Sequence, residues 1–261
     1  MDERDQVLGK LGDLGALGGV RWAHASAYGQ LWQDYEPDGG HDQAWVGFTA
    51  HKFLINRQDR VFQCGEYTAP EGEPSVGRDV LAKGIADRDF RTMPWLAPGI
   101  VVRHDLNASP GWVAGGWRWL MASYKFGHID KIRWQDRSET KGVVARQPHS
   151  ADDGGLFGVA ELFGLPESAD GLRGTLVLAH AMDPDTGEVE LFLGRSRWNA
   201  GGGVPWVWRE NLLALPPAAG GGRPLVGEVG QADTRDDAAD ARVHVRRSIR
   251  ADDRPRAIGE A

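Results

Sequence analysis

The sequence predicts an α+β fold with a mainly antiparallel β-sheet, a few short helices and a single globular core. Two segments have the pattern of β-hairpins, and the strand and helix signals do not alternate regularly, as they would in a doubly wound parallel sheet. Apolar residues make up 41% of the 261 residues, with eleven tryptophans and eight phenylalanines among them. Side chains of this size and number are enough to fill a core.

The N-terminal region indicates one short helix over residues 5–17. Three glycines weaken this helix by about 1 kcal/mol each relative to alanine. A helix is still indicated because apolar residues recur at helical intervals, namely Val7, Leu8, Leu11, Leu14 and Leu17. An aromatic stretch over residues 22–35 follows, and the turn-forming residues 36–40 end it.

Two β-hairpins are the clearest local signals. The first covers residues 53–64, where the polar residues 56–59 separate two apolar runs. The second covers residues 175–193, with its turn over residues 183–187. The second signal is the stronger one because Pro184 and Gly187 suit the backbone dihedrals of a turn.

The remaining elements are expected to be short, and their order along the chain is irregular. Further strands are expected at residues 100–103, 129–134, 142–146 and 204–208. Further helices are expected at residues 80–85, within 112–124, and at 156–163 and 209–213.

The composition changes at Pro216 and predicts two regions. Residues 1–215 are expected to form the α+β globular domain. Residues 216–261 are expected to be a Gly/Pro linker followed by a flexible charged tail, because they hold few large apolar side chains. Val243, Val245 and Ile249 are the tail residues that suit one short strand.

Composition also excludes several classes of protein. No run approaches the roughly 20 apolar residues of a membrane span, and the charged N-terminus has no secretion signal, so we expect a cytoplasmic protein without a membrane partner. A single cysteine, Cys64, rules out an intrachain disulfide or a thiolate-rich metal site. The net charge of −7 disfavours polyanion binding by the whole surface, so any such binding requires a local basic patch.

Residues 117–149 form such a basic patch in the sequence. They contain seven Lys or Arg and three Asp or Glu, a local net charge of +4, with aromatic residues interleaved. Cations attract phosphate and aromatic faces stack on bases, so the segment predicts contact with nucleic acid or nucleotide. The predicted binding residues are Trp119, Lys125, Lys131, Arg133, Trp134 and Arg137. The alternative is that the aromatics belong to the core and the cations to its solvated surface.

Within this segment, Asp130 and the run Glu139-Thr140-Lys141 form a candidate catalytic set. An acid followed at a distance by acid–x–lysine resembles the motif of the PD-(D/E)xK nucleases. The resemblance covers about a dozen residues, and polar residues 135–138 stand where that family usually has an apolar strand. It implies Mg²⁺ or Mn²⁺ held by Asp130 and Glu139, with Lys141 positioning water. His128, beside Asp130, joins these predicted metal ligands.

The sequence therefore leaves three functions open. The first is a Mg²⁺-dependent nuclease or phosphodiesterase, or a protein that binds nucleic acid or nucleotide. The second is a non-catalytic binding or assembly protein, with an aromatic-rich interface and homo-oligomers. The third is a metal enzyme that uses His and Asp on a small molecule. Whether the protein is an enzyme stays open, and no motif for a nucleotide cofactor is present.

Overall fold

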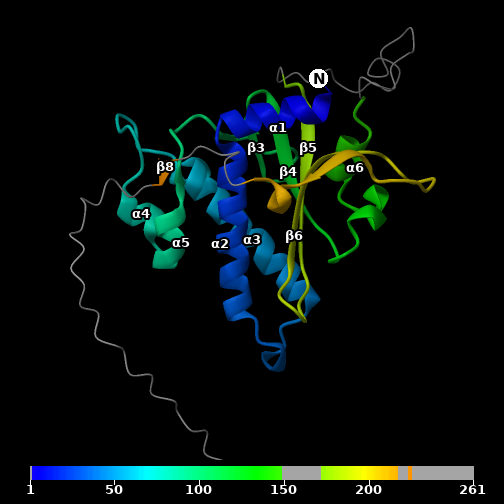
Figure 1. The fold of residues 1–261 in the computed structure, drawn as a ribbon, viewed down its shortest axis with the longest axis horizontal. Helices are drawn as coiled ribbons and strands as arrows, with labels where there is room; N and C mark the ends of the chain where they lie inside the picture. The colour runs from blue at the N-terminus through cyan, green and yellow to red at the C-terminus, as the bar shows by residue number, and fades with distance from the viewer. Residues whose placement is uncertain (1, 149–171, 217–222, 225–261) are drawn as a thin grey trace, which may run out of the picture. The chain divides into compact units, whose positions relative to one another are not determined.

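The computed structural model describes residues 2–148, 172–216 and 223–224 (Figure 1). The chain divides into two units, Met1–Gly227 and Glu228–Ala261. All of the described residues belong to the first unit. None of the helices in these ranges combines the length and the apolar character that crossing a membrane requires.

The secondary structure begins with helices and continues mainly with strands. The α-helices are α1 (Glu3–Asp13), α2 (Ala16–Asp34), α3 (Gln43–Phe62), α4 (Arg78–Ala82), α5 (Asp87–Thr92) and α6 (Glu139–Ala145). Short 3-10 turns are η1 (Pro37–Gly39), η2 (Gly65–Tyr67), η3 (Ile129–Lys131), η4 (Trp134–Asp136) and η5 (Leu212–Ala214). The strands are β1 (Pro94–Trp95), β2 (Val102–Arg103), β3 (Gly111–Ala114), β4 (Trp117–Ser123), β5 (Gly174–Met182), β6 (Val189–Ser196), β7 (Trp206–Asn211) and β8 (Arg223–Pro224).

The main sheet has six strands in the order β2-β3-β4-β5-β6-β7. Four of its pairings are antiparallel, and β4 pairs with β5 in parallel. β1 and β8 form a separate two-stranded sheet, so residues 223–224 within the predicted linker pair with the folded unit. The predicted class, α+β with a mainly antiparallel sheet, is confirmed.

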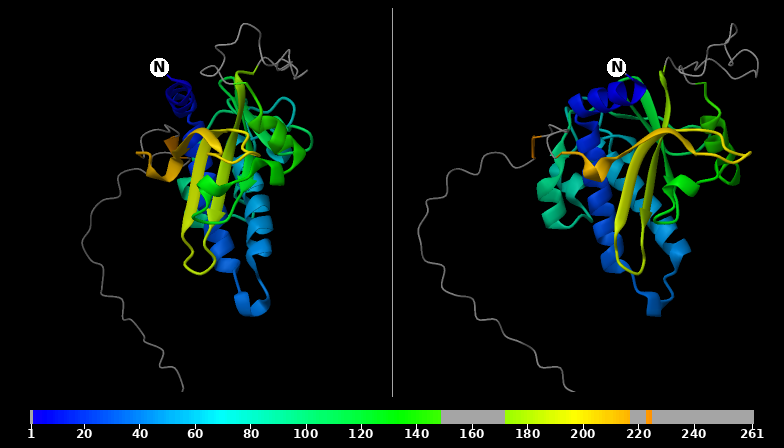
Figure 2. Two further views of the ribbon diagram at one scale, coloured as in Figure 1. Left: turned by 90° about the vertical axis from the view of Figure 1, so that its right-hand side faces the viewer. Right: turned by 45° about the vertical axis from the view of Figure 1, so that its right-hand side comes forward.

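Both faces of the main sheet are covered. Helices α1, α2 and α3 pack on one face, where Trp119, Leu178 and Leu193 point toward them. Leu120, Val177 and Phe192 point to the other face of the sheet. This face packs on residues 124–145, which follow β4 (Figure 2). Alternate side chains of one strand therefore enter two different cores, which explains why β4 and β5 are apolar along nearly their whole length.

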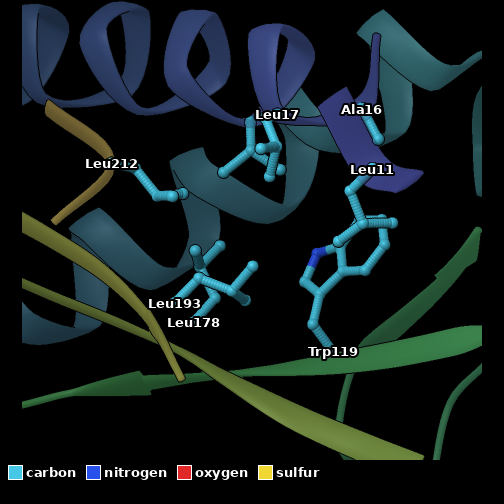
Figure 3. Close-up of a pocket in the computed structure, with 8 residues that line it drawn as sticks. Leu11, Ala16, Leu17, Trp119, Leu178, Leu193 and Leu212 are labelled. Carbon is cyan, nitrogen blue, oxygen red and sulfur yellow. The ribbon is translucent and has the colours of Figure 1, made fainter. Parts of the chain in front are cut away.

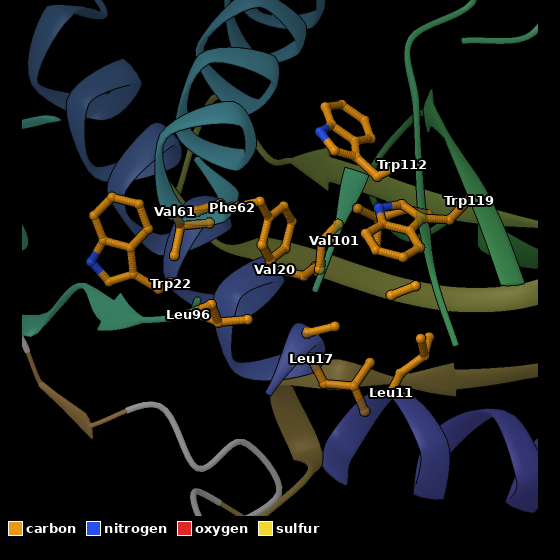
Figure 4. Packing of buried hydrophobic residues seen from close by; sticks show 14 of the residues in the cluster. Leu11, Leu17, Val20, Trp22, Val61, Phe62, Leu96, Val101, Trp112 and Trp119 are labelled. Carbon is orange, nitrogen blue, oxygen red and sulfur yellow. The ribbon is translucent and has the colours of Figure 1, made fainter. Parts of the chain in front are cut away.

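The larger core lies between the sheet and the N-terminal helices. Figure 4 shows Trp119 of β4 reaching toward Leu11 and Leu17. A cavity of about 10 Å³ remains there among apolar side chains (Figure 3). Since it is apolar and about the size of one water molecule, this cavity is a packing defect rather than a ligand site.

The N-terminal helix prediction is confirmed for α1, which Asp2 caps by accepting a hydrogen bond from the Asp5 amide over 2.8 Å. The helical pattern continues beyond Leu14 because Gly15, at φ 73°, turns the chain into a second helix. The aromatic stretch over residues 22–35 lies mostly in this second helix, α2.

The predicted hairpin over residues 53–64 is wrong, because these residues belong mostly to α3. Asp42 caps this helix by accepting from the Trp45 amide, and Gln63, at φ 49°, ends it. Three of the four polar residues taken for a turn are buried instead, namely Arg57, Gln58 and Asp59. Gln58 accepts a hydrogen bond from Trp119 Nε1 over 2.9 Å, and Asp59 accepts one from Trp112 Nε1 over 2.9 Å.

The hairpin over residues 175–193 is confirmed as β5 and β6, with Gly187 at φ 75° in its turn. The strand expected at residues 204–208 overlaps β7, which begins at Trp206. Strand β2 and helix α4 overlap the elements expected at residues 100–103 and 80–85. These predicted elements share strong local turn or apolar signals.

Four other predicted elements are wrong. Residues 112–124 form β3 and β4 rather than a helix, and residues 209–213 continue β7 into η5. Residues 129–134 form η3 and the start of η4 rather than a strand, and residues 142–146 lie mostly in α6. Short apolar runs do not distinguish strand from helix, and tertiary packing decides between them. The helix predicted at residues 156–163 and the strand predicted at residues 243–249 lie outside the described residues.

Candidate anion-binding surface

Residues 124–148, which follow β4, cross the sheet on the face opposite α1, α2 and α3, and we call them the crossing segment (Figures 1 and 2). Tyr124 directly follows β4, and its hydroxyl donates a hydrogen bond to Glu190 over 2.8 Å. The same carboxylate accepts from the Gly127 amide over 3.0 Å. Gly127, at φ 72°, then turns the chain across the sheet.

Apolar side chains and an asparagine hold this crossing segment in place. Ile129, Ile132 and Trp134 are buried against the sheet. Asn199 donates to the Ile132 carbonyl over 2.8 Å and accepts from the Trp134 amide over 3.2 Å. Because these anchors fix the backbone, the polar side chains between them are directed to solvent.

Two adjoining hollows lie over the crossing segment. The smaller one, of about 220 Å³, is lined by Tyr124, Lys125, His128, Lys131, Ile132, Arg133, Asp136 and Arg137. The larger one, of about 460 Å³, is lined by Asp130, Lys131, Ile132, Arg133, Gln135 and residues 199–203. They share Lys131, Ile132 and Arg133, and we call the combined surface the basic groove.

The carboxylates of the basic groove are already paired. Arg209 donates two hydrogen bonds to Asp130, over 2.9 and 2.8 Å, and these bonds raise the pKa of the Arg209 guanidinium. Arg133 forms an ion pair with Asp136, in which Nε lies 3.2 Å from Oδ2. Within the described ranges, the remaining cations, Lys125, Lys131 and Arg137, have no ion pair.

Burial lowers the pKa of the Arg137 guanidinium, and the neighbouring Asp136 opposes this effect. Arginine stays protonated throughout the physiological pH range. The basic groove therefore presents a constant positive charge to solvent.

No family model, curated protein or solved structure matches the chain. The role of the basic groove is therefore argued from its own chemistry.

The aromatic residues predicted to stack on bases are not part of this surface. Trp119 is 1% exposed and Trp134 is fully buried. Trp119 packs under the N-terminal helices, and Trp134 donates from Nε1 to the Pro205 carbonyl over 2.7 Å. The four predicted cations, in contrast, are exposed. The alternative reading of this segment, aromatics in the core and cations on the surface, describes it better.

The candidate catalytic residues are placed apart. Glu139 is exposed at the start of α6, whereas Lys141 is buried in the same helix. Residues two positions apart on a helix point about 200° away from each other, whereas on a strand they share a face. Asp130 is in the η3 turn and is paired with Arg209. The acid–x–lysine geometry of the nuclease motif therefore does not form in α6.

Lys141 has an unusual environment of its own. It is 8% exposed, and no residue in the described part of the chain pairs with it. Burial lowers the pKa of its amine to about 8.

The proposed metal ligands do not form a cluster. No group of three or more His, Cys, Asp or Glu suited to a metal occurs among the described residues. His128 lines the smaller hollow, and Asp130 lines the larger one. The predicted set of Asp130, Glu139 and His128 therefore has no geometric support among the described residues.

The glycine-rich loop over residues 199–203 was missed as a site element. It lines the larger hollow opposite Lys131 and Arg133. Gly202 and Gly203 have φ angles of 93° and 94°, which favour glycine. Because glycine has no side chain, the loop backbone is open here. An asparagine followed by three nearby glycines was the available signal, but sequence alone does not indicate what such a loop faces.

Proposed function

We propose that the protein binds phosphate-bearing polyanions, nucleic acid first among them, through the basic groove. The observation that carries this proposal is that four exposed cations line two adjoining hollows, while both carboxylates there are paired. Cations that neutralise phosphates release bound counterions, which favours binding most strongly at low salt. The groove can do this locally although the chain as a whole carries a charge of −7.

The expected mode of recognition is through phosphates rather than bases. Base stacking needs exposed aromatic faces, and Trp119, Tyr124 and Trp134 are buried. Contacts with the phosphate backbone carry no direct sequence information. We therefore expect affinity to depend on charge and salt but little on base sequence.

We further propose binding without cleavage as the basal activity. A Mg²⁺- or Mn²⁺-dependent phosphodiesterase at this place needs carboxylates that converge on one metal ion. Asp130 is engaged by Arg209, and Glu139 points away from Lys141 on α6. These contacts favour a binding role, for which EDTA leaves affinity unchanged.

The test is fluorescence anisotropy of labelled duplex and single-stranded DNA and RNA at a series of salt concentrations. For phosphate contacts by the three unpaired cations, we expect the logarithm of affinity to fall with the logarithm of salt concentration with a slope of about −3. The double variant Lys125→Ala/Arg137→Ala should bind at least about tenfold more weakly and reduce the slope by about 2.

The matched control is Lys83→Ala. Lys83 is exposed at the end of α4, on other elements than the groove (Figure 1). This variant should keep wild-type affinity and salt dependence. The proposal fails if no polyanion binds in a salt-dependent way, or if Lys83→Ala weakens binding as much as the groove variant. Cleavage that requires Mg²⁺ and is lost in Glu139→Ala would restore the phosphodiesterase.

A further inference from the structure

A second charged surface, of opposite sign, occupies the connection between α2 and α3. Residues 22–51 contain four carboxylates and no Lys or Arg. All four carboxylates are exposed, and they are Asp34, Glu36, Asp38 and Asp42. We call this surface, together with its aromatic residues Trp32, Tyr35, His41 and Trp45, the acidic knob.

The aromatic residues of the acidic knob stack on one another. Trp32 and Tyr35 have ring centroids 6.1 Å apart and nearly parallel planes, and Tyr35 lies 6.2 Å from Trp45. His41 stacks on Trp45 at 3.9 Å. Trp32 nevertheless remains 44% exposed. A large exposed ring beside carboxylates is typical of a surface that contacts cations or another protein.

The acidic knob is held rigid before any partner binds. Asp42 caps α3 by accepting from the Trp45 amide over 2.8 Å, and the Glu36 amide donates to His41 Nδ1 over 3.0 Å. Trp32 packs so closely on Gly187 that a Cβ atom at this glycine would lie 2.9 Å from the indole. Little conformational entropy is therefore lost when this surface binds.

The acidic knob and the basic groove complement each other in charge and form. The knob is the turn that ends the α2–α3 hairpin (Figures 1 and 2). The groove, in contrast, is hollowed. The hairpin and the groove belong to opposite faces of the sheet. Since both are fixed in place, a knob is available to the groove of another copy and not to its own.

We propose that the acidic knob of one copy docks in the basic groove of a second copy, so that the chain associates head to tail. The carboxylates of the knob would pair with Lys125, Lys131 and Arg137, and its exposed indole would stack on a guanidinium. The two contacting surfaces differ, so each bound copy leaves one knob and one groove available. This inference uses the groove of the proposed function but does not require that polyanions bind there.

The test uses two variants that each lack one surface. Glu36→Lys/Asp38→Lys alters the knob without changing the cap of α3, and Lys125→Glu/Arg137→Glu alters the groove. Sedimentation velocity at low salt should show concentration-dependent association of the wild type, which high salt reverses. Each variant alone should associate at least about tenfold more weakly, because like charges then face each other.

The decisive sample is the equimolar mixture of the two variants. The groove variant keeps an intact knob, and the knob variant keeps an intact groove, so the mixture should form a one-to-one dimer and nothing larger. Circular dichroism of each variant checks that it is folded, and Lys83→Glu should associate as the wild type does.

Three outcomes overturn the inference. These are a wild type that stays monomeric at every concentration at low salt, a knob variant that associates normally, and a mixture without the dimer. Its failure is distinct from that of the proposed function, because the knob variant should bind DNA with wild-type affinity. Association without DNA binding would leave the inference standing and remove the proposed function.

Discussion

Individual buried histidines link the stability of this protein to pH. His24 and His180 lie between α2, α3 and the sheet and are almost fully buried. Tyr28 OH lies 2.8 Å from His180 Nδ1, but the Nε2 atoms of both histidines have no hydrogen-bond partner among the described residues. Burial lowers the pKa of His24 to about 3, and a hydrogen bond with the Glu190 backbone acts in the opposite direction. Burial, with His51 and His24 nearby, also lowers the pKa of His180.

Acid should therefore destabilise the fold before its carboxylates are protonated. Both histidines are neutral in the folded state at pH values where the unfolded chain begins to bind protons, near pH 6.5. The free energy of unfolding should fall as pH decreases below this value, by about 2 kcal/mol for His24 at about pH 5, and His180 acts in the same direction. Urea unfolding at a series of pH values measures this, and His24→Leu should remove about 2 kcal/mol of the loss. A stability that stays constant from neutral pH to about pH 5 would contradict the assignment.

At the scale of single elements, the chain shows which local signals sequence can interpret. The hairpin over residues 175–193 was predictable because Gly187 and Pro184 act on their own turn. Helix α3 was not, because the burial of Gln58 and Asp59 depends on Trp119 and Trp112, two tryptophans distant in sequence. The cations of the basic groove were predicted, since charge needs no partner to be recognised. Its glycine-rich loop was not, because only the fold brings β6 and β7 to the crossing segment.

Helix α6 carries a residue that weakens its packing. Lys141 is buried without a partner among the described residues, and burial lowers the pKa of its amine to about 8, below the value of an exposed lysine. At neutral pH this burial of charge costs up to about 3 kcal/mol, and the cost is removed as pH rises from about 8 to 10.5 because the folded state deprotonates first.

Lys141→Met should consequently stabilise the protein at neutral pH by about 1–3 kcal/mol, since methionine fills a similar volume without charge. Thermal or urea unfolding of the variant gives this value, and its advantage over the wild type should shrink toward pH 10. The matched control, Lys131→Met, changes an exposed lysine and should shift stability by less than about 0.5 kcal/mol. A destabilised Lys141→Met would mean that the amine is needed where it lies.

At the scale of the whole folded unit, charge is segregated rather than evenly spread. The net charge of −7 conceals a positive groove over the segment between β4 and β5 and a negative knob on the α2–α3 connection. The sequence contained both charge runs, but only the fold shows that one is hollowed and the other projects from the opposite face of the sheet. Since both proposals assign the same groove cations, polyanion binding and docking of a neighbouring knob are expected to exclude each other.

Competition for the groove should be visible in solution. Duplex DNA added to the associated wild type should disperse it, because phosphates and knob carboxylates compete for Lys125, Lys131 and Arg137. Sedimentation of labelled protein should show smaller species as DNA is added, with a short duplex that holds one protein copy. The knob variant Glu36→Lys/Asp38→Lys should bind this duplex as tightly as the dilute wild type, since it loses no groove contact. Assemblies that keep their size while the DNA co-sediments with them would place the two ligands on different surfaces.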